Sequence, residues 1–309
     1  MAVAAVLFVV GLVFIIKGGD WFVDSASWFA EATGIPKFVV GATVVSFATT
    51  LPELLVSVRA AMNGSAQLAI GNAVGSVTAN TTLIMGLSLV AMAGVVSRKS
   101  FSLKGGLLLA ASIGLTVLSM SGALPTWSAF ILWAIFLIFM ISNLVEGKKA
   151  SENDEIDSYE KKEIPKKVLF FVLGTLGIVF GAEFLVSSGQ TIAKGMGISE
   201  AIIGFTVIAL GTSLPELVTS IVASRKHENG LAIGNVVGSN IFNIMFILGT
   251  TAVLHPLNVT YELSASLVYL ILISAVSLFF ITTDRELSRK EGAIMILLYV
   301  GQLAYKIIG

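Results

Sequence analysis

The chain has 309 residues, of which 56% are hydrophobic and only 12% are charged, and its formal net charge is zero. A soluble domain carries about a quarter charged residues, so this composition excludes an ordinary soluble protein, and the neutral balance gives no sign of nucleic-acid binding. The absence of cysteine excludes disulfides, thiolate metal sites and cysteine nucleophiles.

Long apolar runs separated by short polar breaks predict an all-α membrane protein with ten transmembrane helices. The N-terminus lacks the positively charged segment of a cleaved signal, so the first run is interpreted as a retained span. The predicted spans are 2–24, 36–62, 68–96, 104–121, 126–146, 167–187, 199–224, 230–254, 263–282 and 291–308.

Lysine and arginine gather in the loops on one side of the predicted bundle, which the positive-inside rule places in the cytoplasm. The opposite side offers little beyond Lys194 and Lys306. We therefore expect a multi-pass protein of the cell membrane with both termini outside. The basic residues of the cytoplasmic loops are Lys37, Arg98, Lys99, Lys104, Lys148, Lys149, Lys161, Lys162, Lys166, Lys167, Arg225, Lys226, Arg285, Arg289 and Lys290.

Residues 147–167 form the one long polar segment and are predicted to be a cytoplasmic linker. The linker contains an acidic patch, which is open to two interpretations: a calcium-sensing loop or a solvated connection. No glycine stands where a helix–loop–helix calcium site needs its sharp turn. The acidic residues are Glu152, Asp154, Glu155, Asp157, Glu160 and Glu163.

An internal repeat appears when the chain is compared with itself at an offset of 163 residues. Gly41–Ser88 aligns with Gly204–Thr251 without a gap, and about 21 of 48 positions are identical. The predicted organisation is a first repeat at 1–146, the linker, and a second repeat at 168–309. Each repeat holds five spans, an odd number, so the second enters the membrane from the opposite side. Such inverted repeats are typical of secondary transporters, whose binding site lies near the midplane between the halves.

Glu53 and Glu216 occupy equivalent positions deep inside apolar spans. A carboxylate there costs several kcal/mol unless it is paired, protonated or bound to a cation. No lysine or arginine recurs in the repeat to neutralise them, which favours a bound cation or a proton.

The residues around each glutamate recur with it. Thr49-Thr50-Leu51-Pro52-Glu53 corresponds to Thr212-Ser213-Leu214-Pro215-Glu216. The prolines predict a broken helix, whose free carbonyl groups can bind a cation. A helical path would place the two hydroxyl residues near the carboxylate of their own repeat.

A polar stripe of Asn72, Ser76 and Asn80 recurs as Asn235, Ser239 and Asn243. For Asn72 and Asn235, packing between helices and cation coordination remain equally open. The other stripe residues are interpreted as cation ligands. The combined set of carboxylate, hydroxyl, amide and carbonyl oxygens suits a hard cation such as Ca²⁺, and the same oxygens can hold Na⁺ or protons.

These blocks resemble the repeats of the calcium/cation antiporter superfamily, closest to prokaryotic sodium/calcium exchangers. The resemblance covers about 11–88 and 174–251, and the span count extends it over the chain. It implies four cation sites between the repeats, with spans 1 and 6 sliding across the centre to change access. Carried over by position, it implies these ligands: Ser46 (through its carbonyl), Thr49, Thr50, Glu53, Ser76, Asn80, Ala209 (through its carbonyl), Thr212, Ser213, Glu216, Ser239 and Asn243.

The sequence departs from the family pattern at three of these positions or their neighbours. Ala48 and Thr50 replace the usual glycine and serine, and Asn243 stands where some exchangers carry aspartate. Two carboxylates instead of three leave ion stoichiometry, and sodium versus proton coupling, open.

The predicted function is secondary antiport of Ca²⁺ against Na⁺, expected to be electrogenic, with a lipid bilayer as its surroundings. The protein is not expected to be an enzyme, and neither a cofactor nor an obligate protein partner is indicated. A proton/calcium antiporter using the same glutamates is the main alternative, and potassium coupling or a cation channel are others. An intramembrane hydrolase is a remote alternative, because His227 and His255 lie near predicted span ends and do not recur.

Overall fold

The computed structural model describes residues 2–91, 94–95, 98–120, 122–151, 161–196, 209–255, 257–258, 261–283 and 286–308. Nearly all of these residues are helical, as a chain must be when lipid offers its backbone no hydrogen bonds. The helices are α1 (Ala2–Thr33), α2 (Lys37–Val40), η1 (Gly41–Val45), α3 (Ser46–Thr49), α4 (Leu51–Met62), α5 (Ala66–Ala79), η2 (Asn80–Ile84), α6 (Met85–Ala91), α7 (Arg98–Ser119), α8 (Ser128–Ser151), η3 (Lys161–Glu163), α9 (Ile164–Gly195), α11 (Ala209–Gly211), α12 (Leu214–Arg225), α13 (Asn229–Ile241), η5 (Phe242–Ile247), α14 (Leu248–Leu254), α15 (Tyr261–Thr283) and α16 (Arg289–Ile308).

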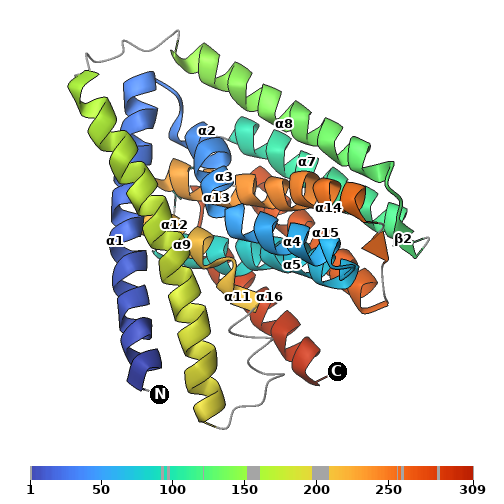
Figure 1. Ribbon diagram of the computed structural model, residues 1–309. Helices are drawn as coiled ribbons and strands as arrows, with labels where there is room; N and C mark the ends of the chain where they lie inside the picture. The colour runs from blue at the N-terminus through green and yellow to red at the C-terminus, as the bar shows by residue number, and fades with distance from the viewer. Residues whose placement is uncertain are drawn as a thin grey trace.

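Two long helices, α1 and α9, lie side by side along one flank of the bundle (Figure 1). They run antiparallel and meet through glycines: a Cβ atom on Gly11 would lie 2.9 Å from the carbonyl oxygen of Gly181, and one on Gly18 would lie 2.9 Å from that of Gly174. Small residues allow helices in a membrane to approach this closely. Because α1 and α9 begin the two repeats, their opposite directions agree with an inverted arrangement.

The helix that carries Glu53 is broken, as its proline predicted, but the break precedes the proline. α3 ends at Thr49, α4 begins at Leu51, and the two parts meet at an angle of 48°. Pro52 lies in the first turn of α4, where its missing N–H costs no helical hydrogen bond. In the second repeat α11 ends at Gly211 and α12 begins at Leu214, again just before a proline.

Within the described residues, three π-helical segments interrupt the α-helices near the centre, which the sequence did not predict. η2 begins at Asn80 and η5 spans the equivalent residue Asn243. A π-helical turn widens the helix locally and often marks a functional position. The third segment, η1, lies between α2 and α3, within the first part of the broken helix of the first repeat.

Four short strands in the described part of the chain pair across the two repeats. β1 (Gly94–Val95) pairs antiparallel with β4 (Glu286–Leu287), and β2 (Ala123–Leu124) pairs antiparallel with β3 (Leu257–Asn258). Equivalent residues in the repeats are 163 positions apart, so β1 corresponds to β3 and β2 to β4. The two pairs are therefore related by exchange of the repeats.

Burial separates a central rod from the outer helices. The rod α13–η5–α14 is almost entirely buried, whereas α1, α8 and α9 turn most of their apolar side chains outward. Large exposed residues such as Phe130, Leu144 and Leu169 suit contact with lipid.

Within the described residues, six helices are long and apolar enough to cross a membrane, and the bent pair α2–α4 raises this to seven. A shorter apolar stretch, Ser264–Phe280, lies in α15. The prediction of an all-helical multi-pass membrane protein is confirmed. Both chain ends lie at the same end of the bundle, opposite the end where α8 stops and α9 starts (Figure 1).

Several helices continue past the predicted spans. α8 continues to Ser151 and α9 begins at Ile164, so both helices extend into the linker predicted at 147–167. α1 and α9 also extend past their predicted ends at residues 24 and 187. Hydropathy marks where a helix leaves the hydrocarbon, whereas a helix continues into water wherever its residues favour it. Most of the acidic patch, at 152–160, and the first part of the seventh predicted span, 199–208, lie outside the described residues.

Candidate functional site

Two buried glutamates define the centre of the candidate site. Glu53 lies in the first turn of α4 and Glu216 in the first turn of α12, and both are 0% exposed. None of their four carboxylate oxygens has a hydrogen-bond partner among the described residues. Glu53 also experiences the charge of Glu216, so the repeats bring the two carboxyl groups together. A buried pair of this kind needs a cation or protons to balance it.

Each carboxyl group faces hydroxyl groups from both repeats. Ser76 and Ser213 interact with Glu53, and Thr49 and Ser239 interact with Glu216. The carboxylate oxygens nevertheless have no hydrogen-bond partner within the described residues, so these hydroxyls lie near the carboxyl groups without satisfying them.

The expectation that Thr49 and Thr50 serve the glutamate of their own repeat was wrong. The Thr50 hydroxyl donates to the carbonyl oxygen of Ser46 at 2.5 Å, and Thr49 faces Glu216. In the same way Ser213 faces Glu53 instead of Glu216. The break before each proline interrupts the helical path, so side chains on its two sides point to different repeats.

Ser46, expected to offer its carbonyl oxygen, is fully buried where the repeats meet. That oxygen already accepts hydrogen bonds from the backbone N–H and the hydroxyl of Thr50, and the Thr49 hydroxyl oxygen lies 3.3 Å from it. The Ser46 hydroxyl donates to the carbonyl oxygens of Gly41 and Asn235 at 2.6 and 3.2 Å. The corresponding Ala209 begins α11.

Asn72 and Asn235 form matching bridges between the repeats. Asn72 Nδ2 donates to the carbonyl oxygen of Glu53 and to Ser57, while its Oδ1 accepts from Thr212. Asn235 Nδ2 donates to the carbonyl oxygen of Glu216 and to Ser220, while its Oδ1 accepts from Thr49. The structure thus places both asparagines next to the predicted ligands.

Asn80 and Asn243 differ in their hydrogen bonding, although both are fully buried. Neither end of the Asn80 amide has a partner among the described residues. Asn243 Nδ2 donates to the carbonyl oxygen of Ser239 at 2.9 Å, which leaves only its Oδ1 without a partner there. Both Oδ1 atoms are therefore suited to coordinate a cation.

Glycines allow the two repeats to meet at the site. A Cβ atom on Gly41 would lie 2.5 Å from the carbonyl oxygen of Leu231. One on Gly234 would clash with the carbonyl oxygen of Phe38, and one on Gly238 with the Ser46 hydroxyl. The helix starting at Lys37 therefore crosses α13 with the two backbones in contact. This close crossing brings the hydroxyl groups of the first repeat next to the polar stripe of the second repeat.

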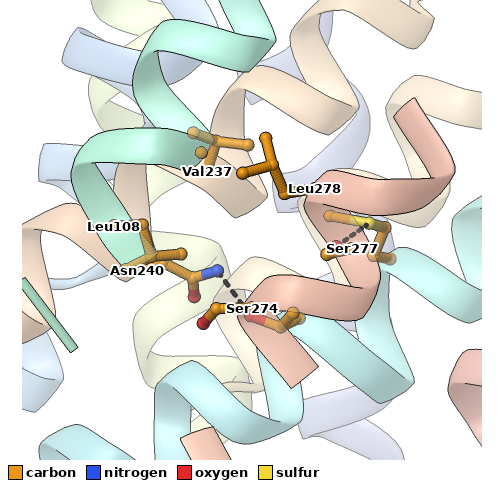
Figure 2. Close-up of a pocket in the computed structure, with 9 residues that line it drawn as sticks. Leu108, Val237, Asn240, Ser274, Ser277 and Leu278 are labelled. Atoms are coloured by element: carbon orange, nitrogen blue, oxygen red, sulfur yellow. Dashed lines mark hydrogen bonds between the residues drawn. The ribbon is translucent and has the colours of Figure 1, made fainter. Parts of the chain in front are cut away.

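A small cavity lies beside the site, between α13, η2 and α15 (Figure 2). Asn240 Nδ2 donates to Thr81 across the repeats at 2.8 Å, and Figure 2 shows this amide reaching toward the helix that carries Ser274. The volume of about 10 Å³ is close to that of one water position. Sequence analysis missed Asn240 and Thr81, because their repeat counterparts Val77 and Ile244 are apolar and only recurring polar residues were considered.

Asp20, which recurs as Glu183, lies outside the central site. Its carboxylate is 3.3 Å from Lys226 Nζ, which also lies 2.8 Å from that of Asp24. Asp20 therefore ties α1 to the end of α12, whereas Glu183 is exposed on α9.

The site combines two carboxylates with hydroxyl and amide oxygens; within the described residues no group of three acidic, histidine or cysteine side chains occurs. A set of oxygen ligands that are mostly uncharged fits Ca²⁺ or Na⁺ better than a transition metal.

A family profile described as "Sodium/calcium exchanger protein" matches residues 3–145 and again residues 166–308. The chain belongs to the sodium/calcium exchanger family. The two matched segments start 163 residues apart, the offset found within the sequence.

Relatives extend this assignment over almost the whole chain. The putative antiporter CaxA of Alkalimonas amylolytica is 32% identical, with 97% of this chain and 98% of that protein covered. The sodium/calcium exchanger MaX1 of Methanosarcina acetivorans is also 32% identical, with 96% of both chains covered. The solved structure of the sodium-calcium exchanger NCX_Mj superposes with a TM-score of 0.88 at 29% identity, covering 98% of this chain and 99% of that one.

Family membership makes this chain a membrane cation antiporter. The hydrolase alternative loses its support, because relatives of this kind are exchangers and both histidines lie at helix ends. His227 lies in the turn after α12, and His255 directly follows α14.

Proposed function

We propose that this protein exchanges Ca²⁺ for Na⁺ across the cell membrane by alternating access. The observation that carries the proposal is the pair Glu53 and Glu216, fully buried at the contact between the repeats with carboxylate oxygens that lack partners among the described residues. Two negative charges balance one Ca²⁺, and the same oxygens hold Na⁺ or protons when Ca²⁺ leaves. Competition for one site that opens to one side at a time couples the two fluxes.

The proposed ligands are the residues implied by the sequence resemblance. Open oxygens on Glu53, Glu216, Ser76, Asn80, Ser213 and Asn243 support this set. Thr49 and Thr212 contribute hydroxyls held by asparagines of the other repeat. The Thr50 hydroxyl donates its proton to the carbonyl oxygen of Ser46, so the lone pairs of the Thr50 oxygen remain for a cation. The Ser46 carbonyl oxygen, which accepts from Thr50, gives up one of its hydrogen bonds when it binds a cation. The hydroxyl of Ser239, whose oxygen lies 3.4 Å from that of Thr49, and the carbonyl oxygen of Ala209 complete the set.

The proposed architecture is ten spans in two inverted five-helix repeats. Antiparallel α1 and α9, the strand pairs related by repeat exchange and the two family matches support it. Chain ends at one end of the bundle agree with an even number of spans (Figure 1). The proposed orientation, with the end near Ser151 in the cytoplasm and both termini outside, is supported by the basic loops through the positive-inside rule.

Exchange is proposed to be electrogenic. If more than two Na⁺ replace one Ca²⁺, each cycle moves positive charge through the membrane. The potential then contributes about 2.3 kcal/mol per charge per 100 mV.

The test is ⁴⁵Ca²⁺ uptake into proteoliposomes loaded with sodium or with choline at matched internal and external pH. Uptake that requires internal sodium, and that increases when the potential is made to favour outward positive charge, is the expected result. Liposomes containing the Glu53→Gln/Glu216→Gln variant provide the background. Uptake that ignores sodium and follows a pH gradient would contradict sodium coupling and assign the glutamates to proton/calcium exchange.

A further inference from the structure

Asn72 and Asn235 occupy equivalent positions in the two repeats. Their sequence pattern alone does not distinguish a role in helix packing from a role as cation ligands. Their amide groups lie where the helix carrying one glutamate meets the hydroxyl motif of the other repeat. Each amide contacts three groups: a backbone carbonyl at a glutamate, a serine hydroxyl in the same repeat and a threonine hydroxyl in the other.

The orientation of each amide follows from its carbonyl partner. A backbone carbonyl accepts hydrogen bonds and cannot donate them, so the NH₂ end must face it. Asn72 Nδ2 lies 3.2 Å from the carbonyl oxygen of Glu53, and Asn235 Nδ2 lies 3.4 Å from that of Glu216. The second proton of each NH₂ group goes to Ser57 at 2.9 Å or to Ser220 at 3.1 Å. Both Oδ1 atoms are thereby directed toward the other repeat.

The directed Oδ1 atoms determine where the threonine protons point. Thr49 donates to Asn235 Oδ1 at 3.1 Å, and Thr212 donates to Asn72 Oδ1 at 3.3 Å. A hydroxyl has one proton and two lone pairs, and only the lone pairs bind a cation. Once the proton is held by the asparagine, the lone pairs of the threonine oxygen remain for an ion.

Thr49 has two other possible acceptors, the carbonyl oxygen of Ser46 at 3.3 Å and the hydroxyl oxygen of Ser239 at 3.4 Å, and both are further away than Asn235 Oδ1. The Ser239 hydroxyl can donate its own proton to Thr49 instead of accepting one. The comparison is therefore with the carbonyl oxygen of Ser46. That oxygen already accepts from the backbone N–H and the hydroxyl of Thr50 at 2.9 and 2.5 Å. Asn235 Oδ1 is both closer and less occupied, so it is the better acceptor for the Thr49 proton.

We propose that Asn72 and Asn235 are positioning residues that orient the hydroxyl of the opposite repeat's threonine for cation binding. Asn235 orients Thr49, and Asn72 orients Thr212. Each asparagine also holds the backbone carbonyl at a glutamate, so one amide links the backbone at a glutamate of one repeat to a hydroxyl of the other. The inference rests on the proposed cation exchange and adds to it two residues outside the implied ligand set.

The test is a pair of double-mutant cycles with a crossed control. ⁴⁵Ca²⁺ binding to the purified full-length protein is measured for Asn235→Leu, Thr49→Val and their combination, and for Asn72→Leu, Thr212→Val and theirs. The crossed doubles join Asn235→Leu to Thr212→Val and Asn72→Leu to Thr49→Val. Asn143→Leu is the matched control, since Asn143 is buried on α8 and its Nδ2 donates to its own helix at Phe139.

Each site variant is expected to weaken calcium binding about tenfold, the effect of one lost hydrogen bond at a charged ligand. The matched doubles are expected to lose no more than either single variant, because the asparagine acts through its threonine. The crossed doubles are expected to lose about a hundredfold, since their effects are independent. Asn143→Leu is expected to bind calcium like the wild type.

Additive losses in the matched doubles, or equal coupling in matched and crossed doubles, would overturn the inference. If Asn235→Leu does not fold, Asn235→Asp replaces it, because a carboxylate still accepts the Thr49 proton. Thr49→Val must then weaken binding as much in Asn235→Asp as in the wild type, and a smaller loss would also overturn it. A wild-type protein that binds neither ⁴⁵Ca²⁺ nor ²²Na⁺ would instead remove the proposed function and this inference with it.

Discussion

The Glu53 half and the Glu216 half of the site contain equivalent residues but bond them differently. Around Glu216, Thr49 Oγ1 lies 3.4 Å from Ser239 Oγ, and Asn243 donates to the carbonyl oxygen of Ser239. Around Glu53, by contrast, Ser76, Ser213 and both ends of the Asn80 amide lack partners among the described residues.

The two halves differ in how far their ligands are fixed before an ion binds and in how many oxygens are free to bind it. The Glu216 half is held by hydrogen bonds that exist without an ion, so binding there costs little ordering. The Glu53 half has more open oxygens, whose burial is costly until an ion arrives. The two repeats therefore supply the same types of ligand. Their different hydrogen bonds make the Glu216 half the preorganised half and the Glu53 half the one with more free ligand atoms. The predictions below test that division.

The largest expected effect comes from removing either negative charge. Glu53→Gln and Glu216→Gln should each lower calcium affinity by about 100-fold or more, because a buried cation would lose a charge partner. Calcium binding and sodium-driven uptake provide the measurement. Glu291→Gln is the control, since Glu291 is also buried but accepts from the Ser288 N–H at 2.6 Å at the start of α16. Normal exchange by either site variant would contradict the assignment of both halves.

A large effect is also expected from separating the halves. Gly238→Ala places a methyl group against the Ser46 hydroxyl and the carbonyl oxygen of Ala42. Overpacking of this kind costs about 1–3 kcal/mol, so both the unfolding temperature and exchange should fall. Gly301→Ala is the control, because its methyl group would meet no atom of the described residues within 4 Å. Equal behaviour of the two variants would show that this crossing does not set the site geometry.

Asn80 and Asn243 provide the direct comparison between the halves. Asn80→Ala and Asn243→Ala should each weaken calcium binding about tenfold through loss of an amide oxygen. Only Asn243→Ala should also destabilise the protein, by about 1 kcal/mol, because Asn243 donates to the carbonyl oxygen of Ser239. Calcium binding and thermal unfolding in detergent separate the two effects. A greater loss of stability for Asn80→Ala would reverse the proposed division.

The smallest effect is expected beside the site. The double variant Asn240→Val/Thr81→Ile copies the apolar pair formed at the equivalent positions by Val77 and Ile244. Replacing both members of a hydrogen-bonded pair with apolar groups is nearly neutral, so stability should change by less than about 1 kcal/mol. Exchange should be retained. Loss of exchange with normal unfolding would assign the cavity in Figure 2 to the transport path.

The sequence predicted the features that follow from composition and repetition. Apolar runs indicated spans because lipid offers the backbone no partners, and the recurrence of Glu53 as Glu216 identified the buried charges. Pro52 and Pro215 placed the helix breaks to within a few residues. The family assignment followed from the same recurring blocks and was confirmed.

Other features depend on how the helices cross and were not accessible from the sequence. Thr49 was expected beside Glu53 but faces Glu216, because the bend at Thr50 and the crossing at Gly238 decide its neighbours. The roles of Asn72 and Asn235 became distinguishable only from the direction of their amides. Asn240 was missed because its partner Thr81 belongs to the other repeat and neither recurs.

If Ca²⁺ and Na⁺ compete for one site between Glu53 and Glu216, sodium must displace bound calcium. This competition is measured by ⁴⁵Ca²⁺ binding to the purified protein over a series of sodium concentrations at constant ionic strength and pH. We expect complete displacement of calcium, with a steep dependence on sodium concentration that reflects more than one Na⁺ per site. Calcium binding that remains at saturating sodium would show that the two ions do not share the site.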